Sequence, residues 1–252
     1  MDKQKIEAMR VGGKILGKLL QDLKKYVQPG MSERAIDAWV RQEILKRGAG
    51  VAYDMLERKF PGAICISTND ELVHGVPTDY VLQEGDKVSF DLDIFYQGYF
   101  VDSAFTMLVG DKGSAAVRKM IKVTESAMWA GIKQVRAGAQ LGGVGYAIEK
   151  VLKAGKLGVI KNYLGHGIGR EMHEKPDVPN YGKRGQGYVL QVGDTICIEP
   201  MSSLGKPANY VDKDDGWTVK MKDGSIGCHC EHTVLVLEDG CEVLTLADWN
   251  ML

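Results

Sequence analysis

The chain has 252 residues, of which 44% are hydrophobic and 26% charged, and its formal net charge is −1 at pH 7. This balance is typical of a globular protein with a sizeable core, and it gives no electrostatic reason to bind nucleic acid or an anionic membrane surface. No stretch is apolar for long enough to cross a bilayer, and the first twenty residues mix charged and apolar side chains, unlike a signal peptide. The five cysteines are scattered, which favours free thiols in a reducing compartment, with the cytoplasm as the expected location.

In chain order, the first elements are two helices expected over residues 3–26 and 33–47, with Ser32 as the N-cap of the second. A β-hairpin is expected next, over 86–96 and 99–109. Two further helices follow over 115–136 and 141–155, although glycines weaken the start of the last one. The remaining strands are expected over 193–200, 217–222 and 225–237, with Asp223-Gly224 as a turn between the last two.

Two segments of the chain repeat one another. The run YVLQEGDKVSFD at 80–91 returns as YVLQVGDTICIE at 188–199, a shift of 108 residues, with six of the twelve positions identical. Each copy closes on a carboxylate, Asp91 in the first and Glu199 in the second. The repeat predicts a single α+β domain with pseudo-symmetric halves, about 1–110 and 111–252, which share one antiparallel sheet and cover its outer face with two helix pairs.

Acidic side chains of the predicted strands share a face of the sheet. Two registers of the first hairpin are open: one turn places Asp91 opposite Asp102, and the other places Asp93 opposite Asp102. Either register keeps Asp91 and Asp102 on the same face. In the second half, the alternation of side chains along the last strand gives Glu231 the same face as His229.

The pseudo-symmetry brings these acidic edges together. Carboxylates a few ångströms apart cannot all remain ionised unless a cation lies among them. A single strand acid is more often solvated, but four at pseudo-equivalent positions with apolar neighbours predict a metal site. His166, in the glycine-rich run GHGIGREMHEKP at 165–176, is the candidate nitrogen ligand. The four acids are Asp91, Asp102, Glu199 and Glu231.

Five motifs in this order resemble the type I methionine aminopeptidases of the pita-bread family, over essentially the whole chain. They are HGVP at 74–77, two aspartates at 91 and 102 with ten residues between them, GHGIGREMHEKP at 165–176, IEPM at 198–201, and EHT at 231–233. The resemblance implies the pita-bread fold and the removal of the initiator methionine from nascent proteins and peptides whose second residue is small. No long insertion separates Glu199 from Glu231, which is typical of type I rather than type II.

The resemblance also implies a ligand set for two divalent metal ions, with Co2+, Mn2+, Fe2+ or Zn2+ as candidates. Asp102 and Glu231 would bridge both ions, Asp91 would complete one, and His166 with Glu199 the other. An oxygen-rich set with one imidazole suits such metals better than a thiolate zinc site does. In the family mechanism, a metal-bridging hydroxide attacks the first peptide carbonyl.

The remaining implied roles concern catalysis and the methionine pocket. Glu199 would carry the proton to the leaving amine, His173 would donate a hydrogen bond to the developing oxyanion, and His74 would act on the scissile nitrogen. The substrate-binding residues implied are His74, Phe60, Cys65, Met172, His173 and Trp217. The expected partners are the N-termini of nascent polypeptides. Docking to the ribosome is compatible with this role but no basic patch locates it, and nothing in the sequence demands more than a monomer.

Four positions depart from the family pattern. Met172 stands where Phe is usual, and Glu57 where an aromatic side chain is usual. His229 replaces a usual Gln, either as a hydrogen-bonding substitute or as an extra contact to the metal that changes metal preference. Asp93 replaces a small or hydroxyl residue. It is either a solvated acid or an acceptor outside the ligand set, or else it adds negative charge that tightens the second metal.

Two other functions were compared with this one. Aminopeptidase P and prolidase are similar to this chain in the implied fold and ligand set, but they cut before proline. The run GHGIGREMHEKP and Trp217 favour the methionine enzyme. A metal-free binding protein on the same fold would be expected to lose ligands, and all five are present here.

Overall fold

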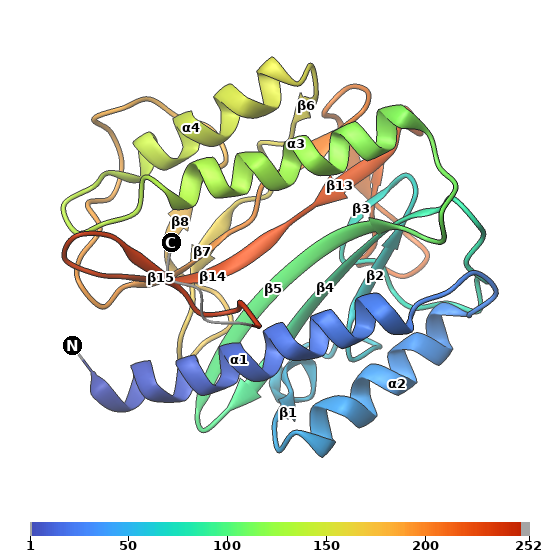
Figure 1. The fold of residues 1–252 in the computed structure, drawn as a ribbon, viewed down its shortest axis with the longest axis horizontal. Helices are drawn as coiled ribbons and strands as arrows, with labels where there is room; N and C mark the ends of the chain where they lie inside the picture. Colours follow the sequence, from blue (N-terminus) through green and yellow to red (C-terminus); the bar gives the residue numbers. More distant parts are fainter. Residues whose placement is uncertain (1, 248–252) are drawn as a thin grey trace.

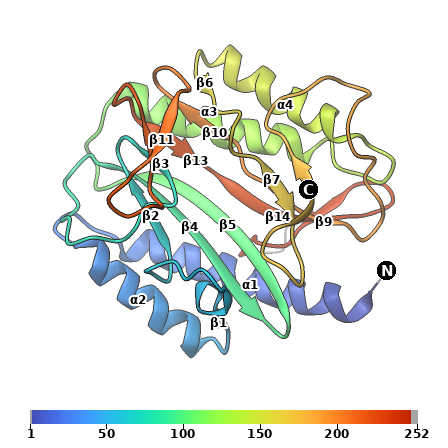
Figure 2. The same ribbon diagram turned by 180° about the vertical axis from the view of Figure 1, so that it is seen from behind.

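The computed structural model describes residues 2–247, and four long helices lie on one face of its main β-sheet (Figures 1 and 2). The predicted α+β class is confirmed. Among these residues, no helix combines the length and the apolar character needed to cross a membrane. The helices are α1 (Lys3–Tyr26), α2 (Glu33–Lys46), α3 (Ala115–Ile132) and α4 (Leu141–Ala154), and a short 3-10 turn covers Ala52–Met55.

The helix starts follow from capping. Asp2 accepts hydrogen bonds from the backbone of Gln4 and Lys5, and Ser32 caps α2 as predicted by accepting from the Ala35 amide. Helix α3 ends four residues before the predicted position. The amide of Ala137 instead donates to the carbonyl of Leu237, which takes this segment out of the helix and against a distant strand.

Helix α4 contains three glycines near its start, and two of them lie against the backbone of another segment. A Cβ atom at Gly142 would lie 2.2 Å from the carbonyl oxygen of Lys183, and one at Gly145 would lie 2.2 Å from that of Tyr181. Gly143 faces open space. Two of the three glycines therefore allow close approach of the 179–186 segment rather than marking a helix break.

The main sheet, within residues 2–247, has the strand order β1-β4-β5-β14-β9-β7-β8, with β2 added to β4 and β15 to β14. Two small sheets, β13-β10-β6 and β11-β12-β3, complete the structure. The strands are β1 (Gly50–Val51), β2 (Cys65–Thr68), β3 (Glu71–Val73), β4 (Lys87–Tyr96), β5 (Tyr99–Leu108), β6 (Gly158–Val159), β7 (Gly165–Gly167), β8 (Glu174–Val178), β9 (Thr195–Ile198), β10 (Met201–Ser203), β11 (Asn209–Val211), β12 (Val219–Met221), β13 (Gly227–His229), β14 (Glu231–Val236) and β15 (Cys241–Val243).

The β4–β5 hairpin adopts the second of the two registers left open by the sequence. Asp93 lies opposite Asp102, because the chain turns at Gln97 and Gly98, both with positive φ. The turn therefore places two aspartates directly across from each other at the centre of the sheet.

The predicted pairing across Asp223-Gly224 is wrong. A turn forms there, with the Gly224 amide donating to the carbonyl of Met221, but it joins two different sheets. Strand β12 pairs with β3 and β11, whereas β13 pairs with β10. The predicted strand 225–237 is also divided at Cys230, whose amide donates to the carbonyl of Pro200, so that β14 alone reaches the main sheet. One sheet therefore does not contain all the strands.

The internal repeat is visible in the backbone. Ser32 bridges to Val81 in the first half, and Gln140 bridges to Val189 in the second, at positions that are 108 residues apart. Strand β14 pairs with β5, which belongs to the first half, and with β9, which belongs to the second half. Strands of the two halves therefore lie next to one another in the main sheet. The repeated halves thus meet at the centre of the main sheet, where the predicted site residues lie.

Candidate metal centre and substrate pocket

The five predicted ligands lie together in one buried cluster. Asp91 belongs to β4 and Asp102 to β5, Glu199 follows β9, and Glu231 begins β14; each residue is at most 7% exposed. His166 lies in the middle of β7, which pairs with β9, and it is 8% exposed. Because the strands come from both halves, the cluster exists only where the halves meet.

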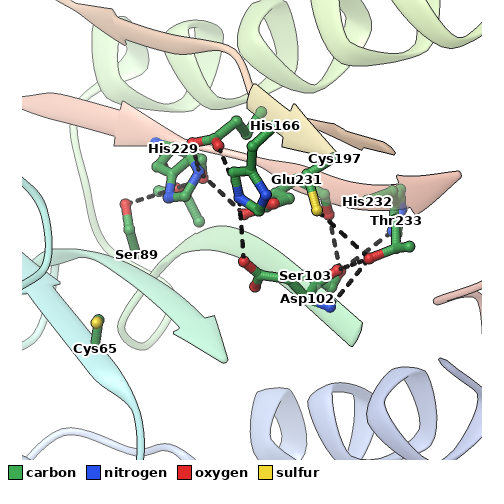
Figure 3. A network of polar contacts seen from close by, with 12 residues as sticks. Cys65, Ser89, Asp102, Ser103, His166, Cys197, His229, Glu231, His232 and Thr233 are labelled. Atoms are coloured by element: carbon green, nitrogen blue, oxygen red, sulfur yellow. Dashed lines mark hydrogen bonds and ion pairs between the residues drawn. The ribbon is translucent and has the colours of Figure 1, made fainter. Parts of the chain in front are cut away.

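The imidazole of His166 faces the carboxylates through one nitrogen (Figure 3). Its Nδ1 lies 3.0 Å from the carbonyl oxygen of Gly167, and its Nε2 lies 3.5 Å from Glu199 Oε1 and 3.9 Å from Asp102 Oδ2. An Nδ1–H that donates to a backbone carbonyl leaves Nε2 with its lone pair toward the cluster. This is the orientation that a metal ligand needs.

Several oxygens of the cluster have no hydrogen-bond partner within the described residues. They are Asp91 Oδ1, Asp93 Oδ1, Asp102 Oδ1 and Glu231 Oε1, and all are shielded from solvent. Buried carboxylates without partners are strongly unfavourable unless a cation compensates them. The donor atoms therefore fit metal ions, and they form three groups within 4.8 Å: Asp102, His166, Cys197 and Glu231; Asp91, His229 and Glu231; and Asp91, Asp93 and Asp102.

Electrostatics within the cluster supports the same interpretation. Burial raises the pKa of Asp91 to about 6, and burial together with the charge of Glu231 raises the pKa of Glu199 to about 8. Burial, and then the charge of Asp93, raises the pKa of Asp102 well above its usual range. Protons and metal ions therefore compete for the same oxygens.

The two predicted catalytic histidines border the cluster but belong to none of the three donor groups. His74 follows β3 in a positive-φ conformation, and burial lowers its pKa to about 4. The ring of His173 lies 4.4 Å from that of His166, and burial, with the His166 ring next, lowers the pKa of His173 to about 4. Both rings are therefore neutral near pH 7, and each can donate one hydrogen bond.

An apolar cluster of side chains adjoins the carboxylates. Cys65 lies opposite Asp91 in the β2–β4 pairing, and the Phe60 ring packs edge-on against Trp217 at 5.5 Å. Met172 is buried in the same hydrophobic cluster. The predicted pocket residues are thus together, although their contact with substrate stays a prediction.

Sequence reasoning missed two residues of this region. Tyr53 packs against Phe60 at 4.8 Å and its hydroxyl lies 3.2 Å from Cys65 Sγ, yet no motif marks it. The Cys197 thiol belongs to one donor group. The repeat offered a signal for Cys197, because it corresponds to Ser89 of β4.

The departures from the family pattern fall in different environments. Glu57 is exposed to solvent. Its neighbour Arg58 stacks on the Trp217 ring at 4.1 Å. In contrast, Asp93 and His229 are 3% and 1% exposed and lie among the donor atoms. The interpretation of Asp93 as a solvated acid is therefore wrong, since it is buried opposite Asp102.

Comparison with known proteins agrees with the fold and the cluster. Residues 7–238 match metallopeptidase family M24. The methionine aminopeptidase of Mycoplasma capricolum is 39% identical over 97% of this chain and 96% of its own length, and that of Clostridium perfringens is 38% identical over 97% of both. The crystal structure of methionine aminopeptidase from Rickettsia prowazekii has a TM-score of 0.94 at 35% identity and covers 98% of both chains.

A prolidase from Pyrococcus furiosus shares the fold alone, with a TM-score of 0.76 at 24% identity over 65% of its own chain. The chain therefore belongs to metallopeptidase family M24. The resemblance to the methionine aminopeptidases of this family is confirmed, because relatives of that name match over nearly their full length.

Proposed function

We propose that the chain is a methionine aminopeptidase that removes the N-terminal methionine from polypeptides whose second residue is small. The observation that carries this proposal is the joint burial of four carboxylates and one imidazole beside an apolar cluster of side chains. This cluster suits an unbranched apolar side chain, because Phe60, Trp217 and Met172 offer aromatic and thioether surface.

The donor set is proposed to hold two divalent cations chosen from Co2+, Mn2+, Fe2+ and Zn2+. When bound, such ions polarise the peptide carbonyl and lower the pKa of a water molecule. The residues proposed as ligands are Asp91, Asp102, His166, Glu199 and Glu231.

Three side chains of the protein are proposed to handle the protons of the reaction. Glu199 lies between the imidazoles of His166 and His229 and moves a proton toward the leaving amine. His173 donates a hydrogen bond to the oxygen on which negative charge develops, and His74 donates to the scissile nitrogen. Both act as neutral donors, in agreement with their burial.

The proposed substrates are the N-termini of nascent polypeptides, and we place the protein in the cytoplasm as a monomer that can act at the ribosome. The five cysteines support a reducing compartment, because all are free thiols and four are buried.

The decisive measurement is hydrolysis of Met-Ala-Ser against an X-Pro peptide, after reconstitution of the chelated protein with each candidate metal. The proposal predicts release of methionine from Met-Ala-Ser. A preference for the X-Pro peptide would assign the chain to the proline-specific branch instead.

His74→Ala tests the separation between ligands and catalytic histidines. We expect turnover to fall by roughly 10²–10⁴-fold, the range for a lost acid–base group, while the metal content stays unchanged. Metal analysis of the purified variant is the second measurement. A loss of metal would make His74 a ligand and contradict the assigned role.

A further inference from the structure

His229 is a buried imidazole without a defined role in the proposed reaction. It is the last residue of β13 and is 1% exposed. Its backbone is held by Thr106, whose hydroxyl accepts from the His229 amide at 3.3 Å and donates to its carbonyl at 2.5 Å. Strand β14 begins two residues later with Glu231. The break at Cys230 therefore separates His229, at the end of β13, from Glu231, at the start of β14.

The His229 ring makes two long ion-pair contacts and, among the described residues, no hydrogen bond. Nε2 lies 3.5 Å from Glu199 Oε2 and 3.5 Å from Glu231 Oε2, longer than an ordinary N–H···O hydrogen bond. Within residues 2–247, neither Nδ1 nor Nε2 has a hydrogen-bond partner. A buried imidazole normally makes at least one hydrogen bond of ordinary length, so a metal ion on Nε2 would complete the contacts that the described residues leave long.

The surroundings of His229 define the missing group. Donor atoms of Asp91, His229 and Glu231 lie within 4.8 Å of one another. Ligands bound to one zinc or cobalt ion at about 2.0–2.2 Å lie roughly 3–4 Å apart. Figure 3 shows His229 and His166 as separate rings beside Glu231. Each imidazole shares a donor group with Glu231, His166 together with Asp102 and His229 together with Asp91.

We propose that His229 is a direct ligand, through Nε2, of the metal ion held between Asp91 and Glu231. This inference rests on the proposed function. Each of the two ions then has its own imidazole, His229 on one and His166 on the other. An added imidazole favours Zn2+, Co2+ and Fe2+ over the harder Mn2+, so His229 is a metal-selectivity residue.

The full chain loaded with two equivalents of Co2+ tests this directly. X-ray absorption counts the imidazoles bound to metal: an average of one per ion is expected for the native protein, and half of that for His229→Gln. Paramagnetic NMR of the native protein gives the same count without any substitution, as two shifted, exchangeable ring N–H signals. His74→Gln removes a neighbouring buried imidazole and should leave both counts unchanged.

Metal affinity is the second measurement. Titration calorimetry should show that His229→Gln weakens Zn2+ binding on the order of 10-fold or more, since the loss of even an outer partner costs 10–100-fold. The loss for Mn2+ should be smaller. Equal losses for both ions, with the imidazole count unchanged, would make His229 an ion-pair partner of Glu199 and Glu231 and overturn the inference. If His166→Gln also left the imidazole count unchanged, the proposed metal site itself would fail.

Discussion

At the scale of single residues, the least favourable feature of this protein is the close approach of buried carboxylates. Asp93 lies directly opposite Asp102, and both have an oxygen without a hydrogen-bond partner within residues 2–247. Burial, and then the charge of Asp91, raises the pKa of Asp93 well above its usual range. The side chain is therefore unfavourable in the metal-free protein and becomes acceptable only when nearby cations compensate it.

We predict that Asp93→Asn stabilises the metal-free protein by about 1–3 kcal/mol, because an uncompensated buried acid is removed. Urea unfolding in the presence of EDTA measures this change. The gain should shrink when metal is bound. Asp177→Asn, at an exposed carboxylate, is the matched control and should change stability little. An unaltered unfolding free energy for the Asp93 variant would contradict this account.

Two titratable groups with shifted pKa values, Lys87 and Glu71, lie outside the site. Lys87 is fully buried and its Nζ donates to the carbonyls of Ser67 and Glu71. Burial lowers the pKa of Lys87 to about 8 and raises the pKa of Glu71 to about 7. Between pH 4.5 and 7 the folded protein retains a proton on Glu71 that the unfolded chain releases. Stability therefore falls as pH rises through this window.

Glu71→Gln should remove that loss. The variant is expected to gain about 1–3 kcal/mol relative to the native protein on going from pH 5 to pH 7.5, since one pKa unit corresponds to about 1.4 kcal/mol. Denaturant titrations at the two pH values provide the measurement. If the two proteins differed in unfolding free energy by the same amount at pH 5 and at pH 7.5, the pKa of Glu71 would not be raised in the folded protein.

At the scale of elements, the helices are the most predictable feature. Two helical glycines, Gly13 in α1 and Gly143 in α4, have very different surroundings. A Cβ atom at Gly13 of α1 would lie 2.2 Å from the carbonyl oxygen of Leu244, whereas Gly143 of α4 has nothing within 4 Å. Glycine therefore serves close packing at position 13 and only lowers helix propensity at position 143.

These positions form a matched pair. Gly13→Ala should destabilise the protein by about 1–3 kcal/mol through backbone overpacking. Gly143→Ala should stabilise it by roughly 0.5–1 kcal/mol, because alanine loses less backbone entropy in a helix. Thermal unfolding of both variants measures the two signs. If both variants changed the stability in the same direction and by the same amount, helix propensity rather than backbone packing would determine the effect at Gly13.

The strands were less predictable than the helices. The hairpin over 86–109 was foreseen from alternation and its turn, but the pairing across Asp223-Gly224 was not. Alternation reveals which side chains share a face, and it says nothing of the partner strand. The chain after Met221 passes to another sheet because Gly227 and His229 of β13 pair with β10, a contact invisible in local sequence.

At the scale of the whole molecule, the proposed metal ions would join the two halves, because their ligands come from both. We predict that EDTA lowers the melting temperature by roughly 5–10 °C: binding at 100 times Kd contributes about 2.7 kcal/mol, and each kcal/mol is worth about 2–4 °C at this size. Calorimetric scans with and without metal measure the shift. His166→Gln should respond less, and an unchanged melting temperature would contradict a shared metal centre.

The sequence alone determined the helices, the first hairpin, the internal repeat and the chemical kinds of donor. These depend on capping, on the spacing of apolar residues and on a duplicated run, all of which are local or directly readable. The acids at the ends of the two repeated runs were recognisable because the same position carried a carboxylate twice.

Only the tertiary structure decided the register that sets Asp93 against Asp102, the break at Cys230, and the places of Tyr53 and His229 beside the cluster. Each depends on backbone segments far apart in the chain approaching one another. Such approaches are governed by the packing of the complete sheet against its helices, so no single segment contains them.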